Sequence, residues 1–491
     1  MATKIPQNVA HFSLDEVLLA TGGVLAWSGA KQARSVTTDS RELTENSLFV
    51  ALRGERFDAH DFLFLAVQAG ASLLVVEACA KVDELIRSLE EGTGQNPPSV
   101  VVVGDTLLAL GKLAGYHRAR FSTKIVAIAG SAGKTTTRSV ISAMLEQAAP
   151  ARVLSTRGNL NNRIGVPMTL LGLSTIHEYA AIEVGTNCPG EVRHLAAIVR
   201  PDVSVLTLID LEHTEGLGDL DGVEREEAAI FEFLPPSGVA IGYGEDLRVR
   251  RRVAAAPCER HLTYGQETGH SYQIVSRVLR SVRRSEIVLK RDDGSLLQFE
   301  SPLVGLAGAL AITAGVAGVE SLTGVRLSSE QCAQALTTAG EPGRHSLVSL
   351  PLDRWLVDDS YNSNPASVEH SVRTGQEIAV QTGGRLWLVL GEMLELGSLS
   401  AASHRQMGEL AARSGAIGTF FVQGDAQLAF DACQGLGGSC WFYADSRDVA
   451  SRLAPLVQSK DVVVVKASRG VRAERVVEGL SQLLDNPPFL S

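Results

Sequence analysis

The chain has 491 residues, too many for one hydrophobic core, so two to four domains are expected and three are favoured. Apolar residues make up 45% and charged residues 20% of the sequence, a balance that excludes extended disorder. The formal net charge of -10 argues against a general binder of nucleic acid or anionic membranes, because either partner would repel the protein. A phosphate-bearing ligand therefore needs a local site.

We expect no signal for export or membrane anchoring in this chain. Its N-terminus lacks a basic start followed by an apolar core, and no apolar run approaches the length of a membrane span. The six cysteines are scattered without metal-ligand spacing, which is typical of reduced thiols in a cytosol. We therefore expect a cytoplasmic protein without membrane insertion, and a monomer by default. The arginine run 248–252 is expected to be a solvated face.

The first expected unit covers residues 1–107. Its strand-like runs are SLFVAL at 47–52, SLLVV at 72–76 and SVVVV at 99–103, and the Gly- and Pro-rich stretch GTGQNPP at 92–98 lies near its end. Together they predict a small N-terminal α/β domain.

From Ile125 onward, short β-branched runs alternate with longer helix-like stretches. This rhythm predicts parallel sheets wound with helices. We expect a central domain over 108–338 with a P-loop-type parallel sheet, and a Rossmann-like C-terminal α/β domain over 339–491. The runs are IVAIA (125–129), AAIEV (180–184), VSVLTLI (203–209) and GVAI (238–241), then WLVD (355–358), LWLVL (386–390), TFFV (419–422) and VVVV (462–465).

Residues 260–300 separate the two series. RHLTYG, SYQIVSRVL and SEIVLKRDDGSLLQF indicate successive strands, with a turn at Asp293-Gly294. We expect them to form an antiparallel appendage of the central domain.

The segment IVAIA-GSAGKTTT-RSVISAML predicts a phosphate-binding loop between an apolar strand and a helix. In such a loop, backbone N–H groups and the helix N-terminus face the phosphates, a lysine adds charge, and a hydroxyl reaches magnesium. Ile128 stands where the usual Walker pattern has its first glycine. The expected ATP-binding residues are Gly130, Ser131, Ala132, Gly133, Lys134, Thr135 and Thr136.

Two candidate metal ligands end neighbouring predicted strands. Glu183 closes AAIE, and His213 follows VSVLTLIDLE. Parallel sheets direct site residues from the carboxyl ends of their strands, and phosphate-bound magnesium prefers hard oxygen ligands. Each residue alone has an ordinary structural explanation, but two at neighbouring strand ends favour a magnesium site.

Further segments resemble the successive motifs of the Mur ligase family, in the family's order and over nearly the whole chain. The resemblance is strongest to the branch that adds D-alanyl-D-alanine to UDP-N-acetylmuramoyl-tripeptide. The segments are TTDSRE (37–42), LFVALRGERFDAHDF (48–62), GNLNNRIGVPMTLL (158–171), EVGTNCPGEV (183–192), EHTEGLGDLDGV (212–223), EPGR (341–344), DDSYNSNPAS (358–367), GEMLELG (391–397) and KASRG (466–470).

The resemblance implies an ATP-dependent amide-bond ligase of peptidoglycan precursor synthesis, with ATP and Mg2+ as cofactors. The tripeptide carboxylate would take the γ-phosphate, giving an acyl phosphate and ADP, and the amine of D-alanyl-D-alanine would then displace phosphate. By this resemblance, Lys134 and Thr135 would hold the ATP phosphates and magnesium, Glu183 a first and His213 a second magnesium, and Arg344 and Asp359 would contact ATP. Ser40 and Arg41 would contact the uridine diphosphate, and Asn162 would lie near the muramoyl end. Lys466, Ser468 and Arg469 would face the dipeptide.

The sequence departs from the family at two important places. Mur ligases commonly carry a carbamylated lysine where this chain has Glu227, and there is no lysine from Thr135 to Leu289. Glu227, or its neighbour Glu226, would deliver the same charge on a shorter arm. We hypothesise that Glu227 supports the second magnesium, directly or through water; the alternative is a solvated helix face. The family's adenine-contacting asparagine and the motif before it are replaced by Ala307, Gly308 and Ala311. A third, smaller departure is Ala467 in KASR, where glycine is usual.

Three other functions stay open. A sibling ligase that adds one diamino acid usually has an Asp-Asn-Pro-Arg motif, whereas this chain has Asp485-Asn486-Pro487-Pro488 in its tail, which favours a terminal turn. A folylpolyglutamate synthase shares the phosphate loop. An ATP-binding homologue without ligase activity would explain the departures at Glu227 and Ala311, but the intact loop opposes it.

Overall fold

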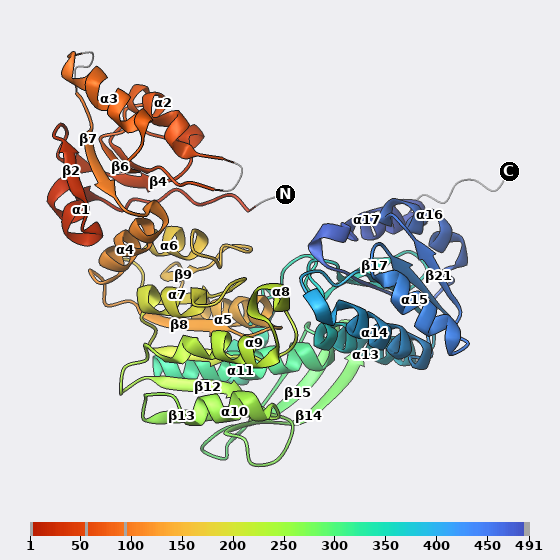
Figure 1. The fold of residues 1–491 in the computed structure, drawn as a ribbon. Helices are drawn as coiled ribbons and strands as arrows, with labels where there is room; N and C mark the ends of the chain where they lie inside the picture. The colour runs from red at the N-terminus through yellow and green to blue at the C-terminus, as the bar shows by residue number, and fades with distance from the viewer. Residues whose placement is uncertain (1–2, 55–56, 93–95, 486–491) are drawn as a thin grey trace. The chain divides into compact units, whose positions relative to one another are not determined.

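The structure is a computed structural model and describes residues 3–54, 57–92 and 96–485. Part of the predicted GTGQNPP stretch, and the tail beyond Asp485, lie outside the described residues, as do positions 55 and 56 of the segment 48–62. Contacts within the chain define two compact units (Figure 1). The first comprises Met1–Ala127, Ala149–Gly185 and Arg193–Pro201, and the second comprises Ile128–Ala148, Thr186–Val192 and Asp202–Ser491.

The first unit contains a five-stranded sheet in the order β2-β7-β6-β5-β4. β2 is antiparallel to β7, and the other neighbours are parallel. The three predicted strands are confirmed as β5, β6 and β7. The elements are β1 (Phe12–Ser13), α1 (Leu14–Thr21), β2 (Val24–Trp27), β3 (Gln32–Ala33), β4 (Ser35–Thr37), β5 (Ser47–Val50), α2 (Leu63–Gln68), β6 (Leu73–Glu77), α3 (Ala80–Glu90), β7 (Ser99–Val103) and α4 (Thr106–Arg118).

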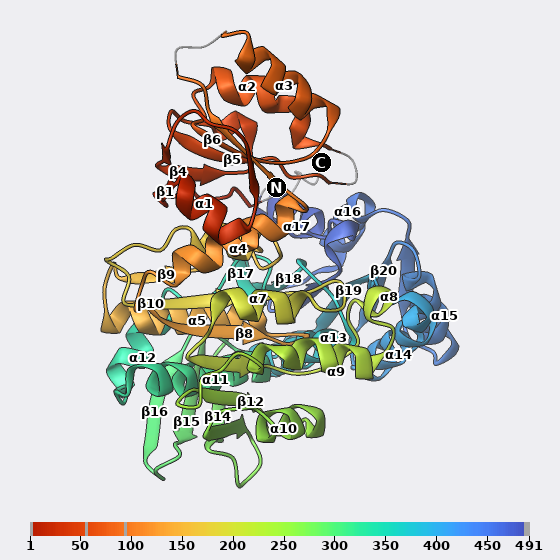
Figure 2. The ribbon, with the colours of Figure 1, turned by 60° about the vertical axis from the view of Figure 1, so that its left-hand side comes forward.

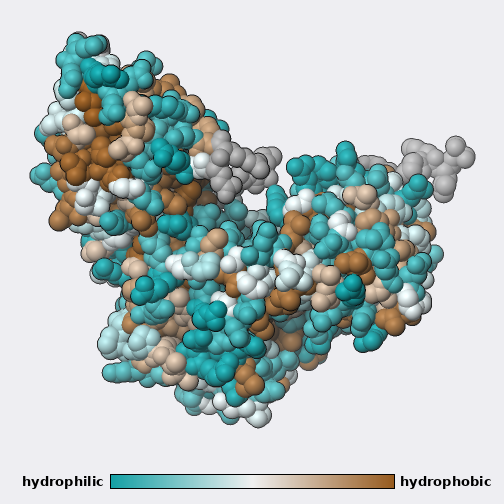
Figure 3. Space-filling view, viewed as in Figure 1, coloured by the Kyte–Doolittle hydropathy of each residue, from teal (hydrophilic) through white to brown (hydrophobic). Residues whose placement is uncertain are grey.

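Helices α2 and α3 cover one face of this sheet (Figure 1). Phe49 and Leu74 of the strands pack against Leu63 of α2 and Leu85 of α3, and all four side chains are almost fully buried. Apolar side chains also reach the surface over α1 and β2 (Figure 3), where the exposed fraction of Val24 is 71%. The first unit also holds α6 (Gly165–Leu170) and the parallel pair β9 (Val153–Ser155) and β10 (Tyr179–Glu183).

The central sheet of the second unit has the strand order β16-β15-β14-β13-β12-β11-β8. Helix α11 packs along β11 to β14, and α10 packs on β12 and β13 (Figures 1 and 2). The elements are α5 (Lys134–Ala148), β11 (Val203–Leu206), α8 (Thr214–Leu217), α9 (Leu220–Ala228), β12 (Val239–Tyr243), α10 (Leu247–Ala254), β13 (Arg260–Gly265), β14 (Tyr272–Ser281), β15 (Arg284–Lys290), β16 (Leu296–Ser301), α11 (Gly305–Thr323) and α12 (Ser329–Leu336). Two elements have residues in both units: β8 (Lys124–Ala129) and α7 (Glu191–Val199).

The predicted antiparallel appendage is only partly correct. β14, β15 and β16 are antiparallel, with the predicted turn between β15 and β16, where Gly294 has a φ angle of 83°. β13, however, runs parallel to β12 and is part of the main sheet, so its inclusion in the appendage was wrong. The reason is helix α10, which carries the chain back across the sheet before β13 and so makes a parallel crossover.

The arginine run lies on α10, but it is not simply a solvated face. Arg248, Arg251 and Arg252 form ion pairs with Glu224 of α9, at 3.3, 3.5 and 2.9 Å. The run therefore helps to join α10 to α9. The expectation that no apolar run approaches the length of a membrane span was wrong, because α11 has that length and composition, the one such helix among the described residues. Of its apolar window, 83% is buried within the protein, which is typical of a core helix.

The C-terminal sheet of the second unit has the order β17-β18-β22-β19-β20-β21, with only β17 antiparallel to its neighbour. Its strands are wound with helices, so the predicted α/β class is confirmed for both sheets of this unit. The elements are β17 (Ser346–Leu350), β18 (Arg354–Asp359), α13 (Pro365–Thr382), β19 (Leu386–Gly391), α14 (Ser400–Arg413), β20 (Gly418–Val422), α15 (Ala426–Gly435), β21 (Cys440–Tyr443), α16 (Val449–Leu453), β22 (Val462–Lys466) and α17 (Glu474–Asp485).

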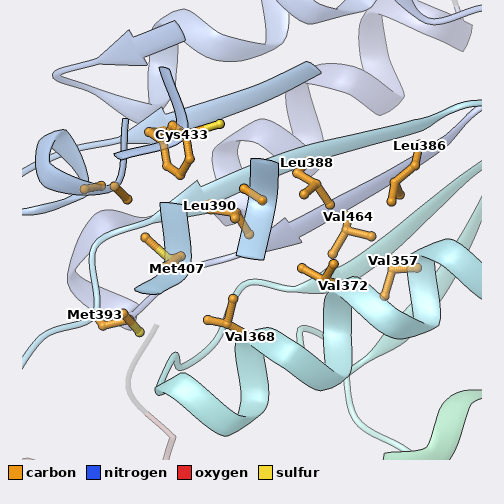
Figure 4. Packing of buried hydrophobic residues seen from close by; sticks show 14 of the residues in the cluster. Val357, Val368, Val372, Leu386, Leu388, Leu390, Met393, Met407, Cys433 and Val464 are labelled. Atoms are coloured by element: carbon orange, nitrogen blue, oxygen red, sulfur yellow. The ribbon is translucent and has the colours of Figure 1, made fainter. Parts of the chain in front are cut away.

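Side chains of the central strands alternate between two cores. Leu386, Leu388 and Leu390 of β19 face the core that contains Val368 and Val372 of α13 (Figure 4). The residues between them face the core under α16 and α17. Because successive side chains of a strand point to opposite faces, an uninterrupted apolar run such as LWLVL fits a strand covered by helices on both sides.

Candidate functional site

The phosphate loop is the turn between β8 and α5. Gly130 and Gly133 have φ angles of 122° and 88°, a conformation that side chains disfavour. A Cβ atom at Gly130 would collide with the Thr207 hydroxyl. The Ser131 N–H donates to the Leu208 carbonyl at 2.7 Å. The loop is therefore held against the segment after β11, and its two glycines are required by the backbone itself.

Lys134, the first residue of α5, lies among acidic groups. Its Nζ donates to the Gly130 carbonyl and, at 3.1 Å, to Glu212 Oε1, and it lies 3.8 Å from Glu227 Oε1. Burial raises the pKa of Glu212 to about 7, Lys134 opposes this shift, and Glu227 adds to it. When both carboxylates are ionised, they leave the cluster negative, which favours a divalent cation beside bound phosphates.

Glu227 is completely buried on α9, which excludes a solvated helix face. Its Oε2 accepts a hydrogen bond from the Gly130 N–H at 2.7 Å, while Oε1 accepts none within the described part of the chain. The preceding Glu226 accepts instead from Thr186 Oγ1 and from the N–H groups of Gly190 and Val192. Helix α9 therefore presents one carboxylate to the phosphate loop and the next to the segment 186–192.

Glu183 lies in the first unit, at the end of β10, with 1% of its surface exposed. Its Oε1 accepts from Asn161 Nδ2 at 2.8 Å, and its backbone N–H donates to the Thr156 hydroxyl at 3.0 Å. A buried carboxylate at a strand end, oriented by an amide, is a suitable hard ligand for magnesium.

His213 lies beyond β11 with φ 51° and ψ 25°, a left-handed conformation. Its Nδ1 pairs with the carboxylate of Glu395, and its Nε2 lies 4.0 Å from Glu212. Burial lowers the pKa of His213, but Glu395 and Glu212 together raise it above its usual value. The Thr214 hydroxyl donates to the Leu396 carbonyl at 2.9 Å. The GEMLELG loop (391–397) is thus docked beside this candidate ligand.

Asp359 and Lys466 end the neighbouring parallel strands β18 and β22. Lys466 Nζ donates to Asp359 Oδ2 and to the Asn362 carbonyl, both at 2.7 Å. Burial would raise the pKa of Asp359, but Lys466 and His345 overcome it and hold the pKa well below its usual value. The pair is therefore ionised, with a buried ammonium group at the edge of the sheet.

Tyr361 lies beneath two guanidinium groups. Arg344 lies 3.9 Å and Arg469 5.2 Å from its ring centroid, and the Arg469 side chain is 47% exposed. Such contacts hold an arginine by cation–π attraction and leave its N–H groups free to bind anions.

One cavity of the second unit brings many of the predicted residues together. It contains about 810 Å³ of space not filled by atoms, part of which is open to solvent. Residues of the phosphate loop line it together with residues of the C-terminal sheet. The predicted residues in its lining are Ser131, Ala132, Gly133, Thr136, Arg344, Asp359 and Lys466.

The remaining predicted residues either line a cavity of the first unit or accept hydrogen bonds from backbone N–H groups. Arg41 lines a cavity of the first unit and forms two hydrogen bonds with the Asp39 carboxylate, at 2.9 and 2.6 Å; Ser40 precedes it in the same turn. Asn162 Oδ1 accepts from the Gly165 N–H at 2.9 Å, at the start of α6. Ser468 is buried and its hydroxyl accepts from the Leu394 N–H at 3.0 Å.

Sequence reasoning assigned no role to several residues of this site. Glu212, Glu395, Tyr361 and His370 were given none, although the first three lie inside quoted motifs. Their contacts join segments far apart in the chain, so spacing alone could not reveal them. Asn161, which orients Glu183, could have been found from the sequence because it directly precedes the predicted residue Asn162.

Three family models cover most of the chain. The Mur ligase middle domain matches residues 128–317, the Mur ligase glutamate ligase domain matches 343–469, and the Mur ligase family catalytic domain matches 32–117. One relative is 34% identical over 91% of this chain and 94% of its own length: the UDP-N-acetylmuramoyl-tripeptide–D-alanyl-D-alanine ligase of Escherichia coli (strain K12). The chain belongs to the Mur ligase family.

Other Mur ligases agree in sequence and fold. The enzyme of the same name from Bacillus subtilis (strain 168) is 30% identical over 91% of this chain and 92% of its own. A crystal structure of MurF from Acinetobacter baumannii matches with a TM-score of 0.82 and 27% identity, over 98% of this chain and all of that one. MurF ligase from Thermotoga maritima in complex with ADP matches with a TM-score of 0.79 and 26% identity, over 92% and 97%. The expected three-domain Mur ligase fold is confirmed.

Proposed function

We propose that this Mur ligase joins D-alanyl-D-alanine to UDP-N-acetylmuramoyl-tripeptide at the expense of ATP, in peptidoglycan precursor synthesis. The observation that carries the proposal is the cavity where the phosphate loop meets Arg344 and Lys466. A loop that binds phosphates, opposed by two further cations, suits transfer of a phosphoryl group. The names of the relatives support the choice of the two acceptor substrates.

The reaction has two steps. A carboxylate oxygen of the tripeptide attacks the γ-phosphorus of ATP, the bond to the β-phosphate oxygen breaks, and ADP leaves. The amine of D-alanyl-D-alanine then attacks the acyl carbon, loses a proton, and expels inorganic phosphate. Negative charge builds on phosphoryl oxygens in the first step and on the tetrahedral carbon's oxygen in the second, so both steps are favoured by fixed cations in a cavity sheltered from water.

This chain's own residues supply those cations. Lys134 moves its ammonium group from Glu212 to the bound phosphates, and Arg344, held on Tyr361, neutralises the transferred group. Asp359, which also lines the cavity, accepts a hydrogen bond from the nucleotide, and Lys466 keeps the Asp359 carboxylate ionised. Gly130, Ser131, Ala132, Gly133 and Thr136 hold the triphosphate through the loop backbone and hydroxyls.

Magnesium fits the oxygen-rich donor set of this chain. In the first unit, Glu183 offers a first ion a buried carboxylate oriented by Asn161. In the second unit, Thr135 begins α5 beside Lys134, and His213, a candidate for a second ion, has its Nδ1 fixed by Glu395 so that Nε2 is left to bind. The ion would neutralise phosphate charge when bound. Glu227, buried beside Lys134, supports the second ion in place of the carbamylated lysine that Mur ligases commonly carry.

The other assignments complete the proposal. Ser40 and Arg41 contact the uridine diphosphate, Asn162 lies near the muramoyl end, and Ser468 and Arg469 help to position the dipeptide. The domains comprise 1–107 for the UDP precursor, 108–338 for ATP, and 339–491 for closure and the dipeptide. We expect the protein to act as a monomer in the cytoplasm.

The test is release of phosphate and formation of the ligated product by the full-length protein. We expect both to require ATP, UDP-N-acetylmuramoyl-tripeptide and D-alanyl-D-alanine together, and to be lost in Lys134→Ala. Single omissions are the controls. Phosphate release with glutamate and a folate acceptor would identify the protein as a folylpolyglutamate synthase. Release with a diamino acid and the dipeptide precursor would identify it as the sibling ligase. Absence of release with every acceptor would mark a non-catalytic ATP-binding homologue.

A further inference from the structure

The nucleotide cavity has one apolar wall. Tyr243 and Tyr264, from the ends of β12 and β13, line it together with Ala307 and Leu310 near the start of α11. The two tyrosine rings lie 5.9 Å apart at 45°. The loop residues bind phosphates, so the flat aromatic base of a nucleotide fits against this wall, where stacking and apolar contact are available.

The wall offers no free side-chain hydrogen-bond donor to the base edge. The Tyr243 hydroxyl donates to Glu245 Oε2 at 2.7 Å, and the Tyr264 hydroxyl donates to the Thr207 carbonyl at 3.5 Å. Both hydroxyls are therefore already engaged. Ala307 and Leu310 have no polar side-chain atom. This wall therefore stacks a base and has no side-chain donor left for its edge.

His370 is one of the polar side chains of this cavity, which Asn362, Asn364 and Ser367 of the same segment also line. It lies on α13, which packs against α11, and it lines the same cavity as Ala307. Its imidazole ring forms no hydrogen bond within the described residues, whereas its backbone carbonyl accepts from Thr374 Oγ1. Burial, and after it His345, lower the pKa of His370. The ring is therefore neutral near pH 7, with one nitrogen that donates and one that accepts.

We propose that His370 reads the edge of the nucleotide base, and that the site accepts 6-oxo purines as well as 6-amino purines. One tautomer accepts from the 6-amino group of adenine, and the other donates to the 6-oxo group of guanine, at the same position. An asparagine side chain held by other hydrogen bonds would present only its oxygen or only its nitrogen to the base. This inference rests on the proposed nucleotide-binding function, but it is independent of the acceptor substrates.

The sequence explains why a polar group from another helix is needed at the base. Ala307, Gly308 and Ala311 stand where Mur ligases usually carry a histidine and asparagines, so α11 contributes no polar group to the base. The imidazole comes instead from α13, a different part of the chain. The change of element leaves the stacking wall in place and alters only the group that meets the base edge.

The experiment measures binding of ADP, GDP, CDP and inorganic tripolyphosphate to the full-length protein by calorimetry. In the unmodified protein we expect the dissociation constants of ADP and GDP to agree within about 10-fold, whereas a site with fixed hydrogen-bond partners discriminates by about 10,000-fold. In His370→Ala we expect the dissociation constants of ADP and GDP to rise about 10-fold, as for one lost hydrogen bond. The dissociation constant of tripolyphosphate should be unchanged. His261→Ala, which alters an exposed histidine, is the matched control.

Two further variants guard against a folding defect. His370→Gln keeps a donor and an acceptor and should retain most of the binding, and Ala311→Asn should favour ADP over GDP. The proposal is overturned if His370→Ala loses as much affinity for tripolyphosphate as for ADP, or if it binds purine nucleotides normally. It is also overturned if the unmodified protein prefers ADP over GDP by about 1,000-fold or more. Absence of binding by any nucleotide would overturn the proposed function itself.

Discussion

The Gly130 N–H donates to the carboxylate of Glu227 at 2.7 Å, and this contact joins the phosphate loop to α9. The second oxygen of the same carboxylate lies 3.8 Å from Lys134 Nζ. Glu227 stands where Mur ligases commonly have a carbamylated lysine. Its carboxylate is part of the side chain itself, so we expect the charge at this position to need no carbon dioxide.

Glu227→Gln should lower kcat about 10- to 100-fold, because the amide can still accept from Gly130 but loses its charge beside Lys134. Turnover of the unmodified enzyme should be the same in bicarbonate-free buffer and after bicarbonate is added. Phosphate release measures both. The matched control is Asp221→Asn, an exposed carboxylate of the same helix. Near-normal turnover of Glu227→Gln, or stimulation of the unmodified enzyme by bicarbonate, would contradict this role.

Gly130→Ala should abolish nucleotide binding, because the new Cβ would collide with the Thr207 hydroxyl at a φ angle of 122°. Calorimetric titration with ADP measures the loss. Gly92→Ala is the control, since Gly92 also has a positive φ angle, 79°, but no atom of the described residues lies within 4 Å of the added carbon. That variant should lose about 1 kcal/mol of stability and bind ADP normally. Normal ADP binding by Gly130→Ala would show that the loop backbone is not fixed as described.

Glu395→Gln should weaken Mn2+ binding in the presence of ADP, about 10- to 100-fold, because the Glu395 carboxylate fixes Nδ1 of His213. Electron paramagnetic resonance of free Mn2+ measures the affinity without catalysis. Glu409→Gln, on the exposed side of α14, serves as the control. An unchanged affinity would mean that the His213–Glu395 contact only docks the loop 391–397.

Asp461→Asn should destabilise the protein by about 2 kcal/mol at neutral pH. The buried Asp461 carboxylate binds the Arg385 guanidinium at 2.6 Å and accepts from Trp387 Nε1 at 3.0 Å. Burial would raise the pKa of Asp461, but these partners lower it overall.

A lowered pKa stabilises the fold above the unfolded value of 3.8, and this contribution is lost as the pH falls through the folded pKa. The difference in thermal midpoint between Asp461→Asn and the unmodified protein should therefore shrink below about pH 4. Asp445→Asn, which alters an exposed ion pair with Arg447, should change the midpoint less at every pH. A difference that does not vary with pH would assign the effect of Asp461→Asn to packing.

Much of this protein could be predicted from local pattern. An apolar strand, two glycines, Lys134 and a following helix are adjacent in the chain, so the phosphate loop was identified and the structure has the same strand–loop–helix order. The strand β19 was equally clear, because an uninterrupted apolar run suits a strand buried on both faces. The order of the motifs indicated the family for the same reason, since each motif is a short contiguous segment.

Only the tertiary structure decided which side chains meet. Lys134 lies between Glu212 and Glu227, His213 is held by Glu395, and His370 shares a cavity with Ala307. Each partner belongs to a distant segment, brought close by strand order and helix packing that short-range periodicity does not encode. Local chemistry therefore determined what the loop can bind, and long-range packing determined which charges and which imidazole surround it.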